Sequence, residues 1–410
     1  MKILHTSDWH MGRALYGRKR HGEFEQFLDW LINCIASEGV GALLICGDVF
    51  DNATPGNRAL ELYYRFLCRA AGAGCRHVVV TAGNHDSPSL LNAPREVLRH
   101  LNVHVVGCMA ESADDEVITL HDGKGAPELI VCAVPYLRDR DIRRAEAGET
   151  FEDKGRKLVD GIRDHYCQIG AAAVAKRSGL GGNIPIVAMG HLFTAGGQTI
   201  DGDGVRELYV GTLGQVGADI FPDCFDYLAL GHLHKAQRVA GSNIRRYCGS
   251  PIPMSFGEAG QLKSVVAVDF RAEGVMVQEI AVPSFQQLAT VRGDWKTICE
   301  RIAGLKNEPA PLWLEVIYEG DEIVADLGER LRELIDGSNL EILRSKNLRL
   351  AERTLGRMAT EETLDDLSVD DVFARCLASH GVPAEQQAEL ILTFGEAVAT
   401  LNEDARAGEA

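Results

Sequence analysis

Long apolar runs and a leader-type N-terminus are both missing from this sequence. No stretch of the 410 residues approaches the ~18–20 consecutive apolar residues that a helix needs to cross a bilayer. The first residues, Met1 to His5, enter an apolar run directly and lack the three-part layout of a signal peptide. These absences argue against an integral membrane protein, and we expect a cytoplasmic protein that has no membrane partner.

Paired cysteines are also missing. The eleven cysteines are an odd number, are scattered along the chain and include no Cys-x-x-Cys pair. This pattern argues against a disulfide framework and against a structural zinc site. We expect reduced thiols that act as small apolar residues in strands and helices.

Positively charged residues are fewer than negatively charged ones. The chain has 42 lysines and arginines against 59 aspartates and glutamates, which gives a formal charge of −17. Long-range attraction to a phosphate backbone is therefore weak, so any nucleic-acid binding must rest on local basic patches, metal ions or a partner protein. The apolar fraction of 46% and the charged fraction of 25% are typical of a soluble globular protein, and the length allows two or three domains.

Apolar runs and amphipathic segments alternate in the first part of the chain. Lys2–Thr6, Ala42–Cys46 and His77–Val80 are predicted strands, and helical spacing of apolar residues predicts helices at Glu23–Glu38 and Ala59–Ala73. This order favours an α/β fold with a mostly parallel sheet, whose ligands lie outside the carboxyl ends of the strands. Val103–Val106 and Leu129–Val134 are predicted to continue this sheet, and Arg246–Ser250 and Val265–Phe270 are predicted to close the same unit. The other predicted elements are strands Ile186–Met189 and Tyr227–Leu230 and a helix at Thr150–Lys176.

Side chains of metal-ligand type follow five of the predicted strands. They are Asp8, His10, Asp48, Asn84, His191, His232 and His234. Singly, such an aspartate is usually a turn or cap residue and such a histidine a core residue, so the prediction depends on their joint occurrence at strand ends. Nitrogen and oxygen donors without thiolate suit manganese, iron or zinc better than calcium or magnesium. Seven ligands are too many for one ion and fit two ions bridged by Asp48, which hold a phosphate and activate a water.

Two further residues are predicted to take part in catalysis. His85 directly follows the predicted ligand Asn84, and we expect it to donate the proton that the departing oxygen needs. Asp51 lies three residues after Asp48, and its carboxylate is expected to accept a hydrogen bond from His85 and to hold the ring as an imidazolium. The alternative for Asp51 is a helix cap.

A short basic loop from Arg13 to His21 follows the first two predicted ligands. It is either a solvated loop or a contact for the phosphate backbone of a nucleic acid beside the metal site. The candidate DNA-binding residues are Arg13, Tyr16, Arg18, Lys19 and Arg20.

The pattern changes near Val282-Pro283, and we divide the chain at this point. Residues 1–282 form the predicted site-bearing domain, and residues 283–350 are predicted to form a small βαβαβ domain without a ligand cluster. Residues 360–405 contain two amphipathic helices whose apolar faces are too short to form a core. Pattern alone does not decide whether these helices dock on the chain's own body or on a partner.

The ligand blocks together resemble one known superfamily. Asp8-x-His10, Gly47-Asp48-x-x-Asp51, Gly83-Asn84-His85-Asp86, Gly190-His191 and Gly231-His232-x-His234 are similar to the motifs of the calcineurin-like metallophosphoesterases. The resemblance implies a four-layer αββα sandwich and two Mn²⁺ per protomer. It implies that one ion takes Asp8, His10, Asp48 and His234, that the other takes Asp48, Asn84, His191 and His232, and that His85 is a catalytic histidine outside the ligand set.

Three longer segments narrow the resemblance. Lys2–Gly12, Phe225–His234 and Gly249–Phe256 are similar to the bacterial nucleases that act with an SbcC-type ATPase in DNA repair. This implies a 3′→5′ double-strand exonuclease and a single-strand or hairpin endonuclease that acts on double- and single-stranded DNA. It also implies a homodimer, a capping domain and C-terminal helices that grip the coiled coil of the ATPase in a heterotetramer.

Three other functions compete with this one. A small-molecule or cyclic-nucleotide phosphodiesterase can use the same metal site, but it has no use for a cap and two docking helices. A protein phosphatase is disfavoured because Asn52, and not an arginine, follows Asp51. A non-catalytic scaffold is disfavoured by the complete ligand set together with His85.

Overall fold

The computed structural model describes residues 1–143, 149–194, 216–320, 324 and 326–347, together with the single positions Phe373, Leu377, Gln387, Leu390 and Phe394. These residues fall into two compact units, one made of Met1–Thr290 with Leu305–Glu315 and Ile335–Arg344, and the other made of the rest of the described chain. The two helices predicted within 360–405 lie outside the described residues, apart from the single positions. Among the described helices, none combines the length and the apolar character that crossing a membrane requires.

A six-stranded sheet carries the first three predicted ligand loops. Its strand order is β14-β13-β1-β4-β5-β6. The bounds are β1 (Lys2–Thr6), β4 (Ala42–Cys46), β5 (His77–Thr81), β6 (Val103–Val106), β13 (Ser264–Arg271) and β14 (Gly274–Ala281). The four strands β1, β4, β5 and β6 run parallel to one another, as predicted, and β13 and β14 add an antiparallel edge. The strand β14 was not predicted.

A second six-stranded sheet carries the remaining ligand loops. Its order is β11-β12-β10-β9-β8-β7. The bounds are β7 (Val117–His121), β8 (Pro127–Ala133), β9 (Ile186–His191), β10 (Tyr227–Gly231), β11 (Gln237–Arg238) and β12 (Arg245–Tyr247). The expectation that Leu129–Val134 continues the first sheet is wrong, because β8 pairs with β7 and β9 in this separate sheet. An apolar run shows that a strand is buried but does not say which sheet it joins.

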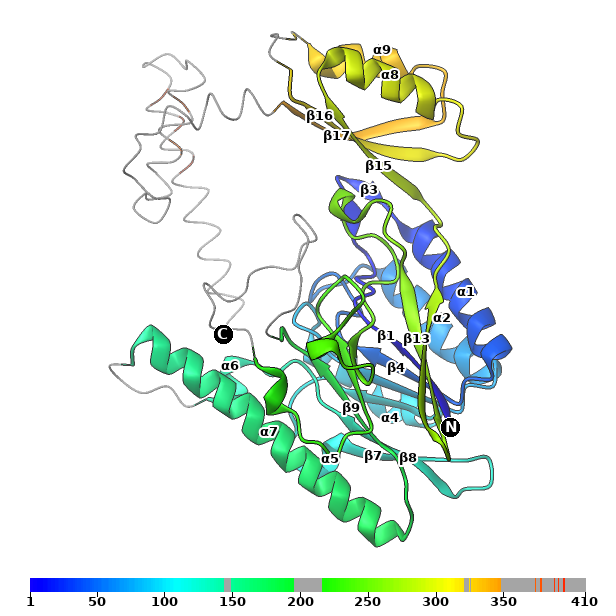
Figure 1. The fold of residues 1–410 in the computed structure, drawn as a ribbon, viewed down its shortest axis with the longest axis vertical. Helices are drawn as coiled ribbons and strands as arrows, with labels where there is room; N and C mark the ends of the chain where they lie inside the picture. Colours follow the sequence, from blue (N-terminus) through cyan, green and yellow to red (C-terminus); the bar gives the residue numbers. More distant parts are fainter. Residues whose placement is uncertain are drawn as a thin grey trace. The chain divides into compact units, whose positions relative to one another are not determined.

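The two sheets pack face to face between two layers of helices (Figure 1). Alternate residues of β4 point to opposite faces: Ala42, Leu44 and Cys46 enter the core between the sheets, and Leu43 and Ile45 enter the core beneath helices α1 (His21–Glu38) and α2 (Asn57–Gly72). The outer face of the second sheet packs on α7 (Phe151–Leu180) through a third core. The layer order is therefore αββα, as the resemblance implied.

The helix ends follow from local sequence. Thr150 and Asp153 form a capping box at the start of α7, and Gly181 ends that helix in the left-handed conformation. Gly39 ends α1 in the same way. Both helices begin or end within a few residues of the predicted positions.

The short elements connect these layers. They are the hairpin β2 (Ala14–Leu15) and β3 (Arg18–Lys19), and helices α3 (Pro88–Asn92), α4 (Arg95–Arg99), α5 (Ala113–Glu116) and α6 (Asp139–Ile142). A three-stranded sheet of order β15-β16-β17 follows, built from β15 (Gln287–Gly293), α8 (Trp295–Leu305), β16 (Leu312–Tyr318), α9 (Leu327–Ile335) and β17 (Leu340–Asn347). This succession has the predicted βαβαβ order.

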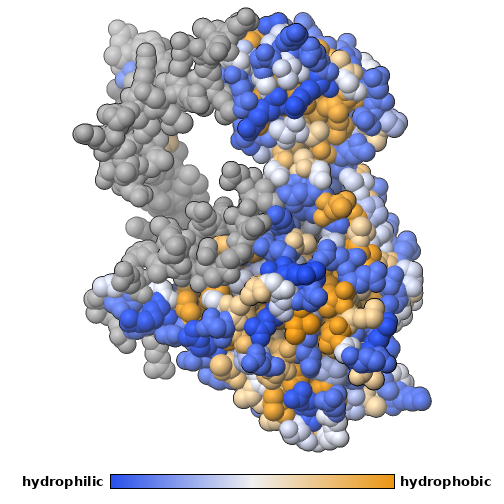
Figure 2. Space-filling view, viewed as in Figure 1, coloured by the Kyte–Doolittle hydropathy of each residue, from blue (hydrophilic) through white to orange (hydrophobic). Residues whose placement is uncertain are grey.

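The ten cysteines among the described residues are free thiols, and five of them are buried as small apolar residues would be. Cys68, Cys108 and Cys167 are exposed, which differs from the sequence prediction. The face drawn in Figure 2 mixes hydrophilic and apolar residues over the described parts. Leu262, with 91% of its surface exposed, and Val97, with 70%, are the most exposed large apolar side chains in the described part of the chain.

Candidate metal centre

The loops after five strands of the two sheets meet in one buried place. The loops after β1 and β4 stay paired beyond the strands, because the Asp8 N–H donates to the carbonyl of Gly47 (3.0 Å) and the His10 N–H donates to the carbonyl of Asp48 (2.9 Å). The two sheets are joined at the same edge by His191, whose Nδ1 lies 3.0 Å from the carbonyl oxygen of Cys46. All seven predicted ligands therefore belong to one constellation, and all except the half-buried Asn84 are buried.

The Asp48 carboxylate lies between two groups of donor atoms. Its Oδ2 is 3.3 Å from His191 Nε2 and 3.6 Å from His10 Nε2. On the His10 side, His10 Nε2 is 3.1 Å from His234 Nε2. On the His191 side, Asn84 Oδ1 is 3.0 Å from His191 Nε2 and 3.1 Å from His232 Nδ1. The Asp48 carboxylate is therefore within reach of both groups of donor atoms.

The residues present fit divalent metal ions. Donor atoms of Asp8, His10 and His234 lie within 4.8 Å of one another, and so do those of Asp8, Asp48 and His191. The Nε2 atoms of His10 and His234 lie 3.1 Å apart inside the protein, and a metal cation would accept the lone pairs of both rings. Nitrogen and carboxylate donors without thiolate match the ligand preferences of first-row transition metals. The geometry supports a divalent-metal centre.

The backbone at the ligand positions is strained. Asp8, His10, Asp48 and His232 have φ values of 54°, 48°, 49° and 104°, in the left-handed region that costs a non-glycine residue about 1–3 kcal/mol. The ligands themselves hold these turns: the His232 N–H donates to both carboxylate oxygens of Asp8 (3.0 and 3.1 Å), and the His85 N–H donates to Asp48 Oδ1 (2.9 Å). The strain places several donor side chains on one side of short turns.

Two glycines allow the close approach of these loops. A Cβ atom on Gly83 would lie 2.1 Å from Asp48 Oδ1, and one on Gly47 would lie 2.2 Å from His191 Nδ1. Gly47 also has a φ of 81°, which favours glycine. The glycines in the Gly-Asp and Gly-Asn-His-Asp blocks are therefore required by the packing of the site.

Burial and mutual charge set the protonation of the site. Burial raises the pKa of Asp8. Burial also opposes ionisation of Asp48, but His191 and the other neighbouring imidazoles lower the pKa of Asp48 well below its usual range. Burial lowers the pKa of His10 well below its ordinary value and lowers that of His232 to about 3. Both rings are therefore neutral near pH 7, the form that has a lone pair to give to a metal.

His191 differs from the other two imidazoles. Burial works against its charge, but contact with Asp48 raises the pKa of His191 to about 9. In the absence of ions, Asp48 and His191 therefore form a buried ion pair, and a metal cation held by His191 would take the place of the proton on this ring.

His85 lies beside this constellation, with its ring centroid 4.9 Å from that of His10. Its Nδ1 lies 2.9 Å from the main-chain carbonyl oxygen of Asp51. The group that holds the ring is thus the carbonyl of Asp51 and not its carboxylate, which differs from the sequence expectation. The carboxylate instead lies 3.2 Å from Arg13 Nη1 and 3.6 Å from His10 Nδ1. The residue is the predicted one, but its side chain faces a ligand and a cation.

The predicted DNA-binding residues of the basic loop differ in their exposure to solvent. Arg18 pairs with Glu341 at 3.0 Å and Lys19 is exposed. Tyr16 stacks on Phe256, with ring centroids 5.7 Å apart.

The DNA-contact prediction is wrong for Arg20. Only 2% of its surface is exposed, and its guanidinium makes a two-point contact with Glu23 (2.7 and 2.8 Å) and donates to the carbonyl of Pro253 (2.7 Å). A guanidinium occupied in this way inside the protein cannot reach a phosphate. The sequence spacing did not distinguish it from the exposed basic residues beside it.

Sequence reasoning gave no role to two buried carboxylates near the site. Asp86 accepts hydrogen bonds from the N–H groups of Val49 (3.1 Å), Phe50 (2.9 Å) and Gly83 (2.9 Å), and so ties the loop after β4 to the loop after β5. Burial, followed by the charge of Asp48, raises the pKa of Asp86 to about 6. Glu258 lies behind His234, at 3.5 Å from its Nδ1. Asp86 belongs to the Gly-Asn-His-Asp block, which was its signal, whereas Glu258 lies just outside the segment that ends at residue 256 and had no signal of its own.

Comparison with known proteins agrees with this geometry. The calcineurin-like phosphoesterase family matches residues 1–236, and the family described as the type 5 capsule protein repressor C-terminal domain, SbcD_C, matches residues 284–381. The SbcD component of nuclease SbcCD from Escherichia coli K12 is 38% identical over 406 residues, which cover 98% of each chain. The protein of the same description from Rhodobacter capsulatus is 36% identical, and the match covers 69% of this chain and 69% of that protein. The one from Bacillus subtilis is 34% identical, and the match covers 70% of this chain and 71% of that protein.

The family match covers more than half of the chain, and the relatives extend the similarity over nearly all of it. Together with the buried donor groups around Asp48, these matches establish the fold and the class of chemistry. The chain belongs to the calcineurin-like phosphoesterases and, within them, to the SbcD nucleases, which are metal-dependent phosphodiesterases.

Proposed function

We propose that this chain is the manganese-dependent nuclease component of an ATP-regulated DNA repair complex. Its activities are 3′→5′ exonuclease on double-stranded DNA and endonuclease on single strands and hairpins. The observation that carries the proposal is the position of the Asp48 carboxylate between two groups of buried donors, with His85 beside them. We propose that the chain acts in the cytoplasm, where its DNA substrate lies.

The seven ligands are proposed to hold two Mn²⁺. Asp8, His10, Asp48 and His234 serve one ion, and Asp48, Asn84, His191 and His232 serve the other. When bound, such a pair of ions neutralises charge on a phosphodiester and supplies a water acidic enough to attack near neutral pH. Manganese is favoured over magnesium because the donor set contains four imidazoles.

His85 is proposed to transfer the proton to the departing oxygen. Its Nδ1 donates to the carbonyl oxygen of Asp51 and keeps that proton, which fixes the ring; the proton transferred is the one that Nε2 carries in the imidazolium form, and the ring is left neutral. The main-chain N–H of His85 donates to Asp48, and this contact keeps the ring beside the ligand set. General acid catalysis of this kind typically contributes about 10²–10⁴-fold to a rate.

The proposed partner is an SbcC-type ATPase with a coiled coil. The curated relatives are named as one component of nuclease SbcCD, which implies a complex of at least two kinds of protein. We propose a homodimer of this chain within a heterotetramer, with 1–282 as the nuclease domain, 283–350 as the cap and the helices of 360–405 docked on the coiled coil. The family match over residues 284–381 supports the view that this chain shares the region after the nuclease domain with the SbcD proteins.

A substrate comparison tests the proposed function. The full chain is assayed with Mn²⁺ or with chelator on hairpin DNA, blunt duplex DNA, cyclic nucleotides and bis-p-nitrophenyl phosphate. We expect chelator-sensitive cleavage of the two DNA substrates and of the chromogenic diester. Cleavage of cyclic nucleotides without cleavage of DNA would replace this proposal by the small-molecule phosphodiesterase.

A further inference from the structure

A buried carboxylate stands directly behind one of the proposed ligands. The segment Gly249–Phe256 leads into a short 3₁₀ turn, Phe256–Glu258, and the side chain of Glu258 is completely buried. Its Oε1 lies 3.5 Å from Nδ1 of His234 and makes no shorter polar contact with a described residue. The opposite ring nitrogen, Nε2, is the one that faces His10 at 3.1 Å. The carboxylate and the proposed metal position therefore lie at opposite ends of the same imidazole.

The other carboxylate oxygen of Glu258 is firmly anchored. Oε2 accepts hydrogen bonds from the main-chain N–H of Met254 (3.2 Å) and from the hydroxyl of Ser250 (3.3 Å), and it is paired with the ammonium of Lys263. A buried carboxylate with this many donors on one oxygen is held in one orientation. Its second oxygen, Oε1, is consequently directed at His234.

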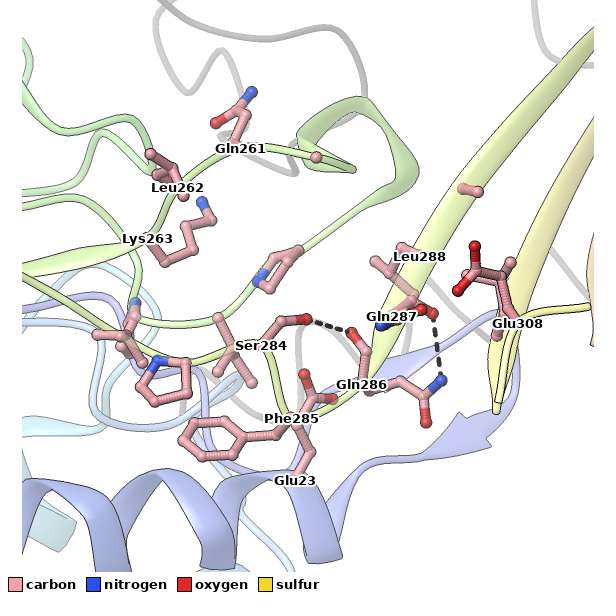
Figure 3. Close-up of a pocket in the computed structure, with 18 of the residues that line it drawn as sticks. Glu23, Gln261, Leu262, Lys263, Ser284, Phe285, Gln286, Gln287, Leu288 and Glu308 are labelled. Carbon is pink, nitrogen blue, oxygen red and sulfur yellow. Dashed lines mark hydrogen bonds between the residues drawn. The ribbon is translucent and has the colours of Figure 1, made fainter. Parts of the chain in front are cut away.

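Lys263 completes this anchor. Its ammonium also contacts the hydroxyl of Ser250 (2.9 Å) and the carbonyl of His234 (3.1 Å), so that it holds both Glu258 and the main chain of the ligand. The side chain lies in the wall of a cavity of about 510 Å³ (Figure 3) and is 7% exposed. A buried lysine with three polar partners neutralises the carboxylate without exposing the pair to water.

We propose that Glu258 is a positioning residue for the metal centre. Its carboxylate accepts a hydrogen bond from the Nδ1–H of His234, which fixes the tautomer that would present the Nε2 lone pair to a metal ion and would make that nitrogen a stronger ligand. His191 is held differently, since its Nδ1 faces the neutral carbonyl of Cys46. The proposal rests on the two-ion centre proposed above and assigns a role to the segment Gly249–Phe256, which the nuclease chemistry alone leaves unexplained.

Metal binding to the full-length chain tests the proposal without an activity assay. Mn²⁺ is titrated into the metal-free protein by calorimetry, and the number of ions and each affinity are measured. We expect two ions for the wild type and, in Glu258→Ala, at least a tenfold loss of affinity at one position with the second position little changed, because outer-shell partners typically contribute about 10–100-fold. Glu258→Gln keeps an oxygen that can accept from Nδ1, so we expect it to recover part of the loss.

A second buried glutamate–histidine pair provides the matched control. Glu116 is completely buried, its Oε2 lies 3.0 Å from His165 Nε2, and neither residue belongs to the metal centre. Glu116→Ala and Glu116→Gln should lower the thermal unfolding temperature but leave both Mn²⁺ affinities unchanged. The unfolding temperature of every variant is measured in chelator to separate loss of folding from loss of a ligand's orientation.

The outcomes are distinct. Wild-type affinities at both positions in Glu258→Ala would overturn the positioning role, and so would an equal loss at both positions with no recovery in Glu258→Gln, since that pattern indicates a general structural role. A wild-type chain that binds fewer than two ions would overturn the proposed two-ion centre itself. A wild-type chain that binds two ions but does not cleave DNA would overturn the proposed function and leave the role of Glu258 standing.

Discussion

Replacing Gly83 by alanine tests the central position of Asp48. The added Cβ would lie 2.1 Å from Asp48 Oδ1 and 2.3 Å from its main-chain nitrogen. A Cβ atom practically never approaches another heavy atom closer than 3.0 Å, so the carboxylate or the loop after β5 must move by about 1 Å. Gly83 does not have a φ in the left-handed region, so the backbone itself tolerates alanine and the effect is steric.

A displacement of this size is large for a metal site. Ligand distances have to agree with the preferred values within about 0.2 Å, and an overpacked buried position costs typically about 1–3 kcal/mol of stability. A misplacement of about 1 Å in an active site lowers the rate by on the order of 100-fold. We therefore expect Gly83→Ala to fold with a reduced unfolding temperature, to bind Mn²⁺ weakly and to retain about 1% or less of the phosphodiesterase activity.

Calorimetric Mn²⁺ titration and hydrolysis of bis-p-nitrophenyl phosphate measure the two effects. Gly56→Ala is the matched control, because it is the same substitution at the N-cap of α2 with no atom within 4 Å of the added Cβ and with a φ of −68°. The control should keep wild-type metal binding and activity. Wild-type Mn²⁺ affinity in Gly83→Ala would refute the reasoning, because it would mean that the Asp48 carboxylate is not fixed at the centre of the ligand set.

Three further predictions address catalysis, DNA binding and partner docking. His85→Asn should bind two Mn²⁺ with wild-type affinity in calorimetry and lose about 10²–10⁴-fold in the turnover of DNA cleavage. Loss of metal binding, or full activity, would contradict the proton-donor role. Arg20→Ala should destabilise the protein by about 3–5 kcal/mol in chemical denaturation, because Glu23 stays buried without its partner. Lys19→Ala should leave stability unchanged and weaken DNA binding, with a shallower dependence of the affinity on salt concentration. Equal effects of Arg20→Ala and Lys19→Ala on stability would refute the division into a buried arginine and an exposed DNA-binding lysine. Deletion of residues 360–410 should spare Mn²⁺-dependent cleavage and abolish its stimulation by the ATPase and ATP; unchanged stimulation argues against docking by these helices.

Much of the fold could be predicted from local patterns. Apolar runs followed by a polar ligand residue, with a glycine before that residue after β4 and β5, predicted β1, β4 and β5 to within a residue, because a buried parallel strand needs an apolar sequence and ends where a polar turn begins. The residues that follow these strand ends in the sequence were sufficient to predict that the ligand-type side chains lie together. The edge strand β14 was missed because its burial alternates between half-buried and exposed positions, which gives no continuous apolar run.

The sequence by itself determined which residue types stand at the strand ends, and hence the metal chemistry and the family. Only the tertiary structure decided which sheet each strand joins, that Arg20 is buried, that the carbonyl of Asp51 holds His85, and that Glu258 stands behind His234. The physical reason is that spacing along the chain reports the local backbone and one face of a strand or helix, whereas these contacts join residues such as Arg20 and Pro253 that are distant in sequence. Their geometry is set by the packing of the two sheets and by burial, which no local pattern records.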